Sequence, residues 1–152
     1  MNLGLIDKVV SWTNGVEGIA VHNISMTNSF LDTHFPLKPI WPGVLTMTAV
    51  SRLAEGVIRA TYDFEKRVKL TRVSNIKWRK YIAPGDQLYI EVKVLSMSEK
   101  EVLVRGKVKV NDKIAAAFGE MQFSFDDALS NSDADAKAFW EERGLKQGES
   151  IE

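Results

Sequence analysis

The chain contains no cysteine and only two histidines among its 152 residues. Without thiols it can form no disulfide, no thiolate nucleophile and no zinc–thiolate site. Two histidines are also too few for a histidine-rich metal site. We therefore expect neither a bound metal nor another cofactor.

The sequence also lacks an excess of charge of one sign, with 20 basic and 20 acidic side chains and a formal net charge of zero. This balance argues against nucleic acid as the main partner. The charge is nevertheless unevenly distributed, because residues 126–152 hold eight acidic and three basic side chains. Residues 1–125 therefore form a basic body, followed by a polar, acidic extension.

No apolar run is long enough to span a bilayer. The first residues also lack the basic start and long apolar core of a signal peptide. We therefore expect a cytoplasmic protein that does not enter a membrane. The length favours one domain, and an apolar content of 45% is enough for a substantial core.

Proline is scarce, yet three of the four prolines fall within residues 34–45, HFPLKPIWPGVL. Each proline fixes its own φ and biases the preceding residue away from helix, so His34 lies in a stiff, non-helical loop. A helix is expected to start at Gly43, where the first N–H groups have no partner within the helix. An imidazole beside such N–H groups could move a proton next to a polarised carbonyl. On spacing alone, the simpler interpretation is a rigid turn in front of a buried helix, with His34 incidental.

The apolar pattern predicts one long helix and a set of strands. Residues 44–60 are apolar over much of the helix circumference, which is typical of a helix buried on most sides. Shorter runs of β-branched and aromatic residues, separated by turn residues, predict an antiparallel meander of strands at residues 6–12, 17–24, 68–73, 76–82, 88–94, 102–110 and 114–125. A single buried helix with such a sheet is an α+β domain. A short helix is expected at residues 134–143 of the extension, ended by Gly144.

The pattern H-F-P-x-x-P-I-x-P-G-V-L at residues 34–45 resembles the signature of the FabZ-type 3-hydroxyacyl-acyl-carrier-protein dehydratases. The likeness continues in register from about residue 5 to residue 125, and it includes LIDKVV at 5–10, NIKWRK at 75–80 and PGDQL at 84–88. The resemblance implies a hot-dog fold for residues 1–125, in which an antiparallel sheet wraps one long central helix. It assigns no inherited role to residues 126–152.

The resemblance also implies a catalytic site. In the family the loop histidine is the base and the N–H of the glycine at the helix start polarises the thioester carbonyl, and His34 and Gly43 match these positions. The family's acid is a glutamate fourteen residues after the histidine, and here that position holds Thr48. Glu55 lies on the same helix face but about 10.5 Å further along the axis, too far to replace this acid. The acyl substrate is expected to contact Phe35, Val44, Met47 and Trp78.

The implied substrate is an acyl-carrier-protein or acyl-CoA thioester of fatty-acid or polyketide-type metabolism. Carrier proteins are acidic, and the basic stretch after the helix would attract them. We expect docking on Lys66, Arg67, Lys69, Arg72 and Arg79. In the family dimer the histidine of one subunit faces the acid of the other. We therefore expect this chain to form a homo-oligomer, either a dimer or a trimer of dimers, or a heterodimer with a homologue that carries the glutamate.

Three functions remain open at this point. The chain could be a dehydratase that is weak alone because the acid is missing. It could instead be a half-catalytic or non-catalytic subunit of a heteromeric dehydratase, paired with a homologue that carries the glutamate. The third alternative is a hot-dog acyl thioesterase, which would need a carboxylate or a positioned water that the sequence does not reveal.

Overall fold

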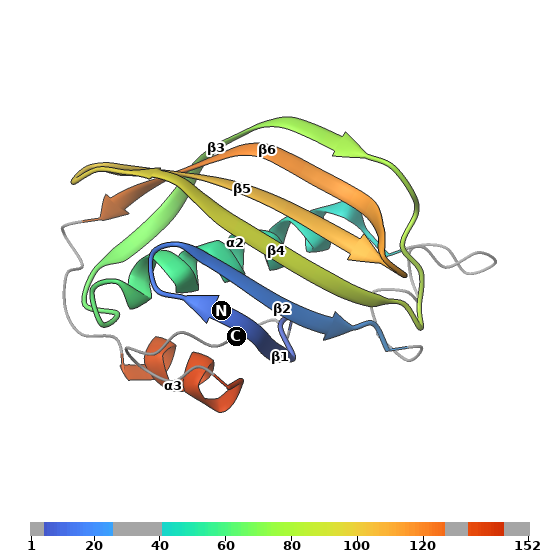
Figure 1. The fold of residues 1–152 in the computed structure, drawn as a ribbon, viewed down its shortest axis with the longest axis horizontal. Helices are drawn as coiled ribbons and strands as arrows, with labels where there is room; N and C mark the ends of the chain where they lie inside the picture. The colour runs from blue at the N-terminus through green and yellow to red at the C-terminus, as the bar shows by residue number, and fades with distance from the viewer. Residues whose placement is uncertain (1–4, 26–40, 127–133, 145–152) are drawn as a thin grey trace.

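The structure is a computed structural model and describes residues 5–25, 41–126 and 134–144. An antiparallel sheet curves around the long helix α2, Gly43–Ala60, and a second helix, α3, Ala134–Glu142, lies beneath the sheet's edge (Figure 1). The strands are β1 Lys8–Thr13, β2 Glu17–Asn23, β3 Arg67–Trp78, β4 Gln87–Met97, β5 Glu101–Val110 and β6 Lys113–Asp126. Neither α2 nor α3 is long and apolar enough to cross a bilayer.

The six strands follow the order β1-β2-β4-β5-β6-β3 across the sheet. The predicted meander is therefore correct for β4, β5 and β6 and wrong for β3, which crosses to the far edge and pairs with β6. The two strands expected at residues 68–73 and 76–82 are one strand that ends at Trp78. Asn75 adopts a positive φ of 57° inside this strand without ending it, because the pairing with β6 continues on both sides.

Helix α2 is the centre of the core. Its face toward the sheet is fully buried, and Leu53 and Val57 have no exposed surface. The sheet approaches so closely that a methyl group at Gly106 of β5 would collide with the Val50 side chain of the helix. This arrangement confirms the predicted α+β hot-dog architecture.

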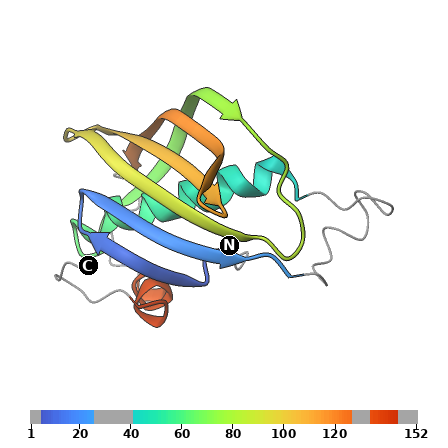
Figure 2. The same cartoon turned by 45° about the vertical axis from the view of Figure 1, so that its right-hand side comes forward.

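Helix α3 lies where the pattern of residues 134–143 predicted a helix, and it packs against the body (Figure 2). Its Trp140 is 5% exposed, and its ring lies 5.1 Å from the ring of Trp12 on β1. Arg143 Nε donates to the carbonyl of Ile6 at 2.7 Å, and the backbone N–H of Val9 donates to the carbonyl of Arg143 at 2.8 Å. The extension therefore covers the β1 edge of the sheet with both side-chain and backbone contacts.

We predict that this contact stabilises the whole domain. Trp140→Ala removes a buried indole ring and should lower the free energy of unfolding by about 3–5 kcal/mol. Glu141→Ala, an exposed neighbour on the same helix, is the control and should change it by less than about 0.5 kcal/mol. Urea unfolding of the full chain measures both values. Equal effects of the two substitutions would show that α3 does not pack as described.

Candidate active site

The N-terminus of α2 is electrostatically uncompensated. Its N-cap residue, Pro42, has an extended ψ of 135° and no side-chain hydrogen bond to the helix, and the first turn contains no acidic residue. Helix N-termini carry a partial positive charge and unpaired N–H groups. An acceptor with developing negative charge would therefore be stabilised at Gly43.

Trp78 from the end of β3 covers this helix start. A methyl group at Gly43 would lie 3.0 Å from Cη2 of Trp78, so a side chain there would push the indole back by a few tenths of an ångström. The ring is held edge-on by Phe118, with centroids 5.6 Å apart. Trp78 and Gly43 thus come together from elements far apart in the sequence.

A cavity of about 770 Å³ opens at this point. The backbone N–H of Trp41 donates to the carbonyl of Ile82 at 2.7 Å and ties the two sides of the cavity together. The residues that line it come from the segment before α2, the first turn of α2 and the segment after β3: Trp41, Pro42, Gly43, Thr46, Trp78, Arg79, Lys80, Tyr81 and Ile82. The volume lies in the range of small-molecule sites.

Two buried polar atoms at this cavity have no hydrogen-bond partner among the described residues. They are the indole nitrogen of Trp41 and the hydroxyl of Thr46, whose residues are 3% and 0% exposed. Sequence reasoning missed both residues. The sequence does mark Thr46 in one way, because its hydroxyl falls on the buried face of the helix. Buried polar groups are normally paired, so a hydroxyl at such a position could have drawn attention to it.

Thr48, in the position of the family's acid, lies one turn along α2 and is half-buried. Its hydroxyl donates to the carbonyl of Val44 at 2.7 Å, so its only proton is already used within the helix. Thr48, Val44 and Met47 do not line the cavity; Val44 is 62% exposed, and Met47 packs against the core. His34 and Phe35 lie outside the described residues.

The basic residues predicted to dock a carrier protein are spread along β3. Arg79 lines the cavity, whereas Arg67 lies twelve residues earlier, roughly 40 Å away along an extended strand. Lys66 places its ammonium 4.4 Å from the ring centroid of Tyr62, and Arg72 lies 3.7 Å from Glu120. The five residues therefore do not form one compact patch.

The second histidine, His22, is buried on β2. Its Nδ1 lies 3.1 Å from Oδ1 of Asp7, whose other oxygen accepts from the backbone N–H of Asn23 at 2.7 Å. Its ring lies 5.8 Å from the ring of Trp41. His22 is therefore a strand histidine with Asp7 as its side-chain partner.

The family model and the most similar curated relatives point to the same kind of protein. A model described as a FabA-like domain matches residues 1–118. The chain is 31% identical over 120 residues to the 3-hydroxyacyl-[acyl-carrier-protein] dehydratase FabZ of Thermoanaerobacter sp. (strain X514), covering 78% of this chain and 84% of that relative.

Two solved structures share the fold. The dehydratase heterocomplex ApeI:P from Xenorhabdus doucetiae matches with a TM-score of 0.59 and 16% identity, over 77% of this chain and 98% of that chain. The smu.793 protein from Streptococcus mutans UA159, bound to acetyl CoA, matches with a TM-score of 0.61 and 15% identity, over 83% of this chain and 90% of that chain. Fold and cavity together define a hot-dog domain with a pocket at the start of its central helix. The chain belongs to the FabA-like domain family.

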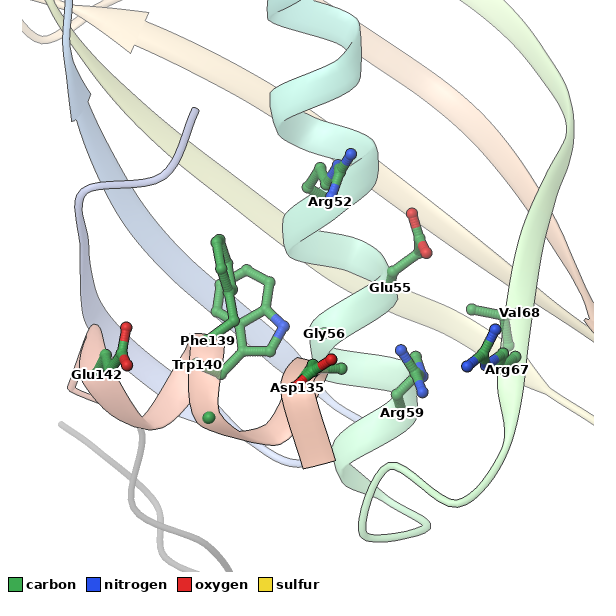
Figure 3. A pocket seen from close by; sticks show the side chains of 12 residues that line it. Arg52, Glu55, Gly56, Arg59, Arg67, Val68, Asp135, Phe139, Trp140 and Glu142 are labelled. Atoms are coloured by element: carbon green, nitrogen blue, oxygen red, sulfur yellow. The ribbon is translucent and has the colours of Figure 1, made fainter. Parts of the chain in front are cut away.

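A second cavity, of about 750 Å³, lies near the other end of α2, between α2, the start of β3 and α3 (Figure 3). Glu55 projects toward it from α2, with Arg67 of β3 and Asp135 of α3 also on its wall. Burial raises the pKa of the Glu55 carboxyl, and the guanidinium groups of Arg52 and Arg59 oppose this rise. Glu55 lies twelve residues after Gly43, about 18 Å along the axis, so it belongs to a different site.

We predict that Glu55 makes the fold less stable as the pH rises. Burial raises the pKa of the Glu55 carboxyl in the folded state above its ordinary value. The protonated carboxyl therefore destabilises the fold less than the carboxylate does, and stability is lost as the pH rises through the folded pKa. Glu55→Gln should therefore raise the melting temperature at pH 7, with a gain that vanishes near pH 4. Thermal unfolding across this range measures the difference. A variant that melts lower than the wild type at pH 7 would contradict the burial argument.

Proposed function

We propose that this chain is a dehydratase-type subunit that binds a 3-hydroxyacyl thioester in the cavity at the start of α2. The observation that carries this proposal is the uncapped helix start at Gly43, which opens into a cavity of about 770 Å³. A preorganised N–H donor stabilises the oxygen of an enolate-like intermediate. The names of the curated relatives support dehydration as the reaction.

The reaction needs a base, an oxyanion donor and an acid. His34 takes the proton from the α-carbon, and the electrons of that C–H bond form the C=C bond as the C3–O bond breaks. The Gly43 N–H stabilises the carbonyl oxygen while negative charge develops on it. The hydroxyl group must leave as water, so it needs a proton from an acid.

That acid is the component this chain does not supply at Thr48. A threonine hydroxyl does not ionise near neutral pH, so it cannot replace a carboxyl. The bond from Thr48 to the Val44 carbonyl also directs its proton away from any substrate. We therefore propose that the chain supplies the base and the carbonyl donor, and that the acid comes from a homologous subunit.

The cavity would receive the acyl group and its thioester. Trp78 is the predicted substrate contact that lies on its wall, and Phe35, Val44 and Met47 remain predictions. The FabZ relative named above is a dehydratase of 3-hydroxyacyl-acyl-carrier-protein, and the Streptococcus mutans structure holds acetyl CoA. Carrier protein and coenzyme A both present a thioester on a pantetheine arm, so the two substrate forms need separate assays.

The family match over residues 1–118 supports a division of the chain near residue 125. We propose a dehydratase-like domain at residues 1–125 and an extension at 126–152 that stabilises it. An assembly of at least two subunits follows from the family's shared active site. The Xenorhabdus doucetiae heterocomplex is a precedent for two different chains in such an assembly.

We predict that the isolated wild-type chain is a poor dehydratase and that Thr48→Glu makes it a better one. General acid assistance typically contributes about 10²–10⁴-fold, and the variant should recover part of this factor. Turnover of a 3-hydroxyacyl thioester by the purified homomer measures it. Wild-type turnover typical of enzymes, together with a slower Thr48→Glu variant, would contradict the missing-acid argument.

His34→Ala is the matched control for this gain. It should abolish turnover in both the wild-type and the Thr48→Glu background while leaving the melting temperature unchanged. Loss of stability together with activity would instead indicate a structural histidine.

Saturated acyl thioesters belong in the same assay, because their hydrolysis would favour the thioesterase alternative.

We also predict that carrier-protein docking uses the cations nearest the cavity. Arg79→Glu with Lys80→Glu should raise KM for a carrier-protein substrate by about tenfold or more but leave a coenzyme A substrate nearly unaffected. Lys93→Glu with Arg105→Glu changes the same charge at exposed positions on β4 and β5 and should affect neither substrate. Equal losses on both substrates would exclude docking as the role of Arg79 and Lys80.

A further inference from the structure

Aromatic side chains are concentrated in the cavity at the start of α2. Three of the nine described residues that line it are aromatic, Trp41, Trp78 and Tyr81, whereas aromatic residues make up 9% of the chain. Trp41 precedes the helix, and the other two belong to the end of β3 and to the segment that follows it. The rings therefore come from two separate parts of the chain and converge on one cavity.

Two of these rings are far more exposed than large aromatic side chains usually are. Trp78 is 53% exposed and Tyr81 is 80% exposed, and both residues line the cavity. Folding alone gives no reason to leave two such rings in solvent, since their burial would be favourable. Exposed apolar side chains that gather at a cavity are typical of a surface that binds a ligand. An aromatic ring offers such a ligand a flat π-face.

Trp78 lies where the reacting end of the acyl group must be. A Cβ built on Gly43 would lie 3.0, 3.3 and 3.4 Å from Cη2, Cζ2 and Cζ3 of Trp78, which are neighbouring atoms of its six-membered ring. This ring therefore packs against the Gly43 backbone, whose N–H is proposed to hold the thioester carbonyl. C3 of the acyl group is two bonds from the carbonyl carbon. A substituent on C3 is thus within reach of the Trp78 ring.

The missing acid restricts the substrate in the same direction. The Thr48 hydroxyl donates to the Val44 carbonyl at 2.7 Å, so the chain itself offers no proton there to the departing hydroxyl. As the C3–O bond breaks, positive charge develops on C3. An aryl or alkenyl group on C3 delocalises this charge by resonance, and a saturated alkyl group does not. A substrate with such a group therefore needs less help from an acid.

We propose that the cavity at Gly43 takes 3-hydroxyacyl thioesters whose C3 carries an aryl or alkenyl group. The proposal rests on the proposed function and names its substrate class. The reaction is otherwise unchanged. The α-proton passes to His34, its electron pair forms the C2=C3 bond, and the hydroxyl takes a proton from the acid of the homologous subunit and leaves as water. The new double bond is conjugated with the thioester carbonyl and with the aryl or alkenyl group, so the acyl group becomes planar beside Trp78 and Tyr81.

The binding test compares two rings of equal size. Amide analogues of the pantetheine thioesters are prepared from 3-hydroxy-3-phenylpropanoic acid and from 3-cyclohexyl-3-hydroxypropanoic acid. Both carry a six-carbon ring on C3, but only the phenyl ring is flat and has a π-face. Titration calorimetry of the full chain should show about tenfold tighter binding of the phenyl analogue, since aromatic contacts contribute beyond the burial of area. Equal affinity for the two analogues, or tighter binding of the cyclohexyl analogue, would overturn the proposal.

Single substitutions identify the rings that give the preference. Tyr81→Leu and Trp78→Leu each remove one ring and should each reduce the tenfold preference to about threefold. Tyr89→Leu is the matched control and should keep the full preference, because Tyr89 lies on β4 and does not line the cavity. Since Tyr81 is 80% exposed, its variant decides the test even where Trp78→Leu fails to fold. A full preference in the Tyr81→Leu variant would contradict the proposal.

Turnover separates the substrate class from the reaction. With the corresponding thioesters, Thr48→Glu should raise turnover of the phenyl substrate less than turnover of the cyclohexyl substrate, because C3–O cleavage beside a phenyl ring depends less on an acid. An equal or larger gain with the phenyl substrate would count against the proposal. If the cyclohexyl analogue binds as tightly and its thioester is dehydrated, the substrate class is wrong and the proposed function stands. If Thr48→Glu dehydrates neither thioester, the proposed function fails and this proposal fails with it.

Discussion

The burial of α2 against the concave face of the sheet is the interaction on which the other features depend. The contact is so close that Gly106 leaves no room for a side chain beside Val50. Leu53 and Val57 are fully buried against the surrounding strands. One face of the helix is buried in the core. A ligand can therefore approach α2 at its first turn or along the side that faces away from the sheet. The two larger cavities lie at these places, one at Gly43 and one at Glu55.

The cavity at Gly43 and the cavity at Glu55 differ in electrostatics, and this difference suits them to different roles. The helix start has no capping side chain and no acid in its first turn, so it favours an acceptor with negative charge. The other cavity holds a carboxyl whose pKa is raised by burial, among arginines. The cavity at Gly43 suits the proposed reaction at a thioester carbonyl, whose oxygen gains negative charge. At the second cavity, the buried Trp140 of α3 packs against Gly56 of α2.

The features that could be predicted from the sequence were local ones. The long helix and the short helix in the extension follow from apolar periodicity and from the residues that end a helix. The position of β3 could not be predicted in this way. This strand pairs with β6, which is distant in the sequence, and local patterns do not reveal such a pairing. At the site, the resemblance assigned roles to Gly43 and Trp78, and these two residues line one cavity. The unpaired polar atoms of Trp41 and Thr46 were not predicted, since burial and pairing appear only after packing.

The central claim is that an acyl thioester places its carbonyl oxygen at the Gly43 N–H. Two-dimensional ¹⁵N NMR of the full chain, titrated with an amide analogue of a 3-hydroxyacyl pantetheine thioester, tests it directly. The analogue cannot be hydrolysed as a thioester, so the measurement reports binding alone. The account predicts that the largest shifts fall on the Gly43 amide and the Trp41 indole N–H. Shifts concentrated around Glu55 and Trp140, with Gly43 unchanged, would contradict it.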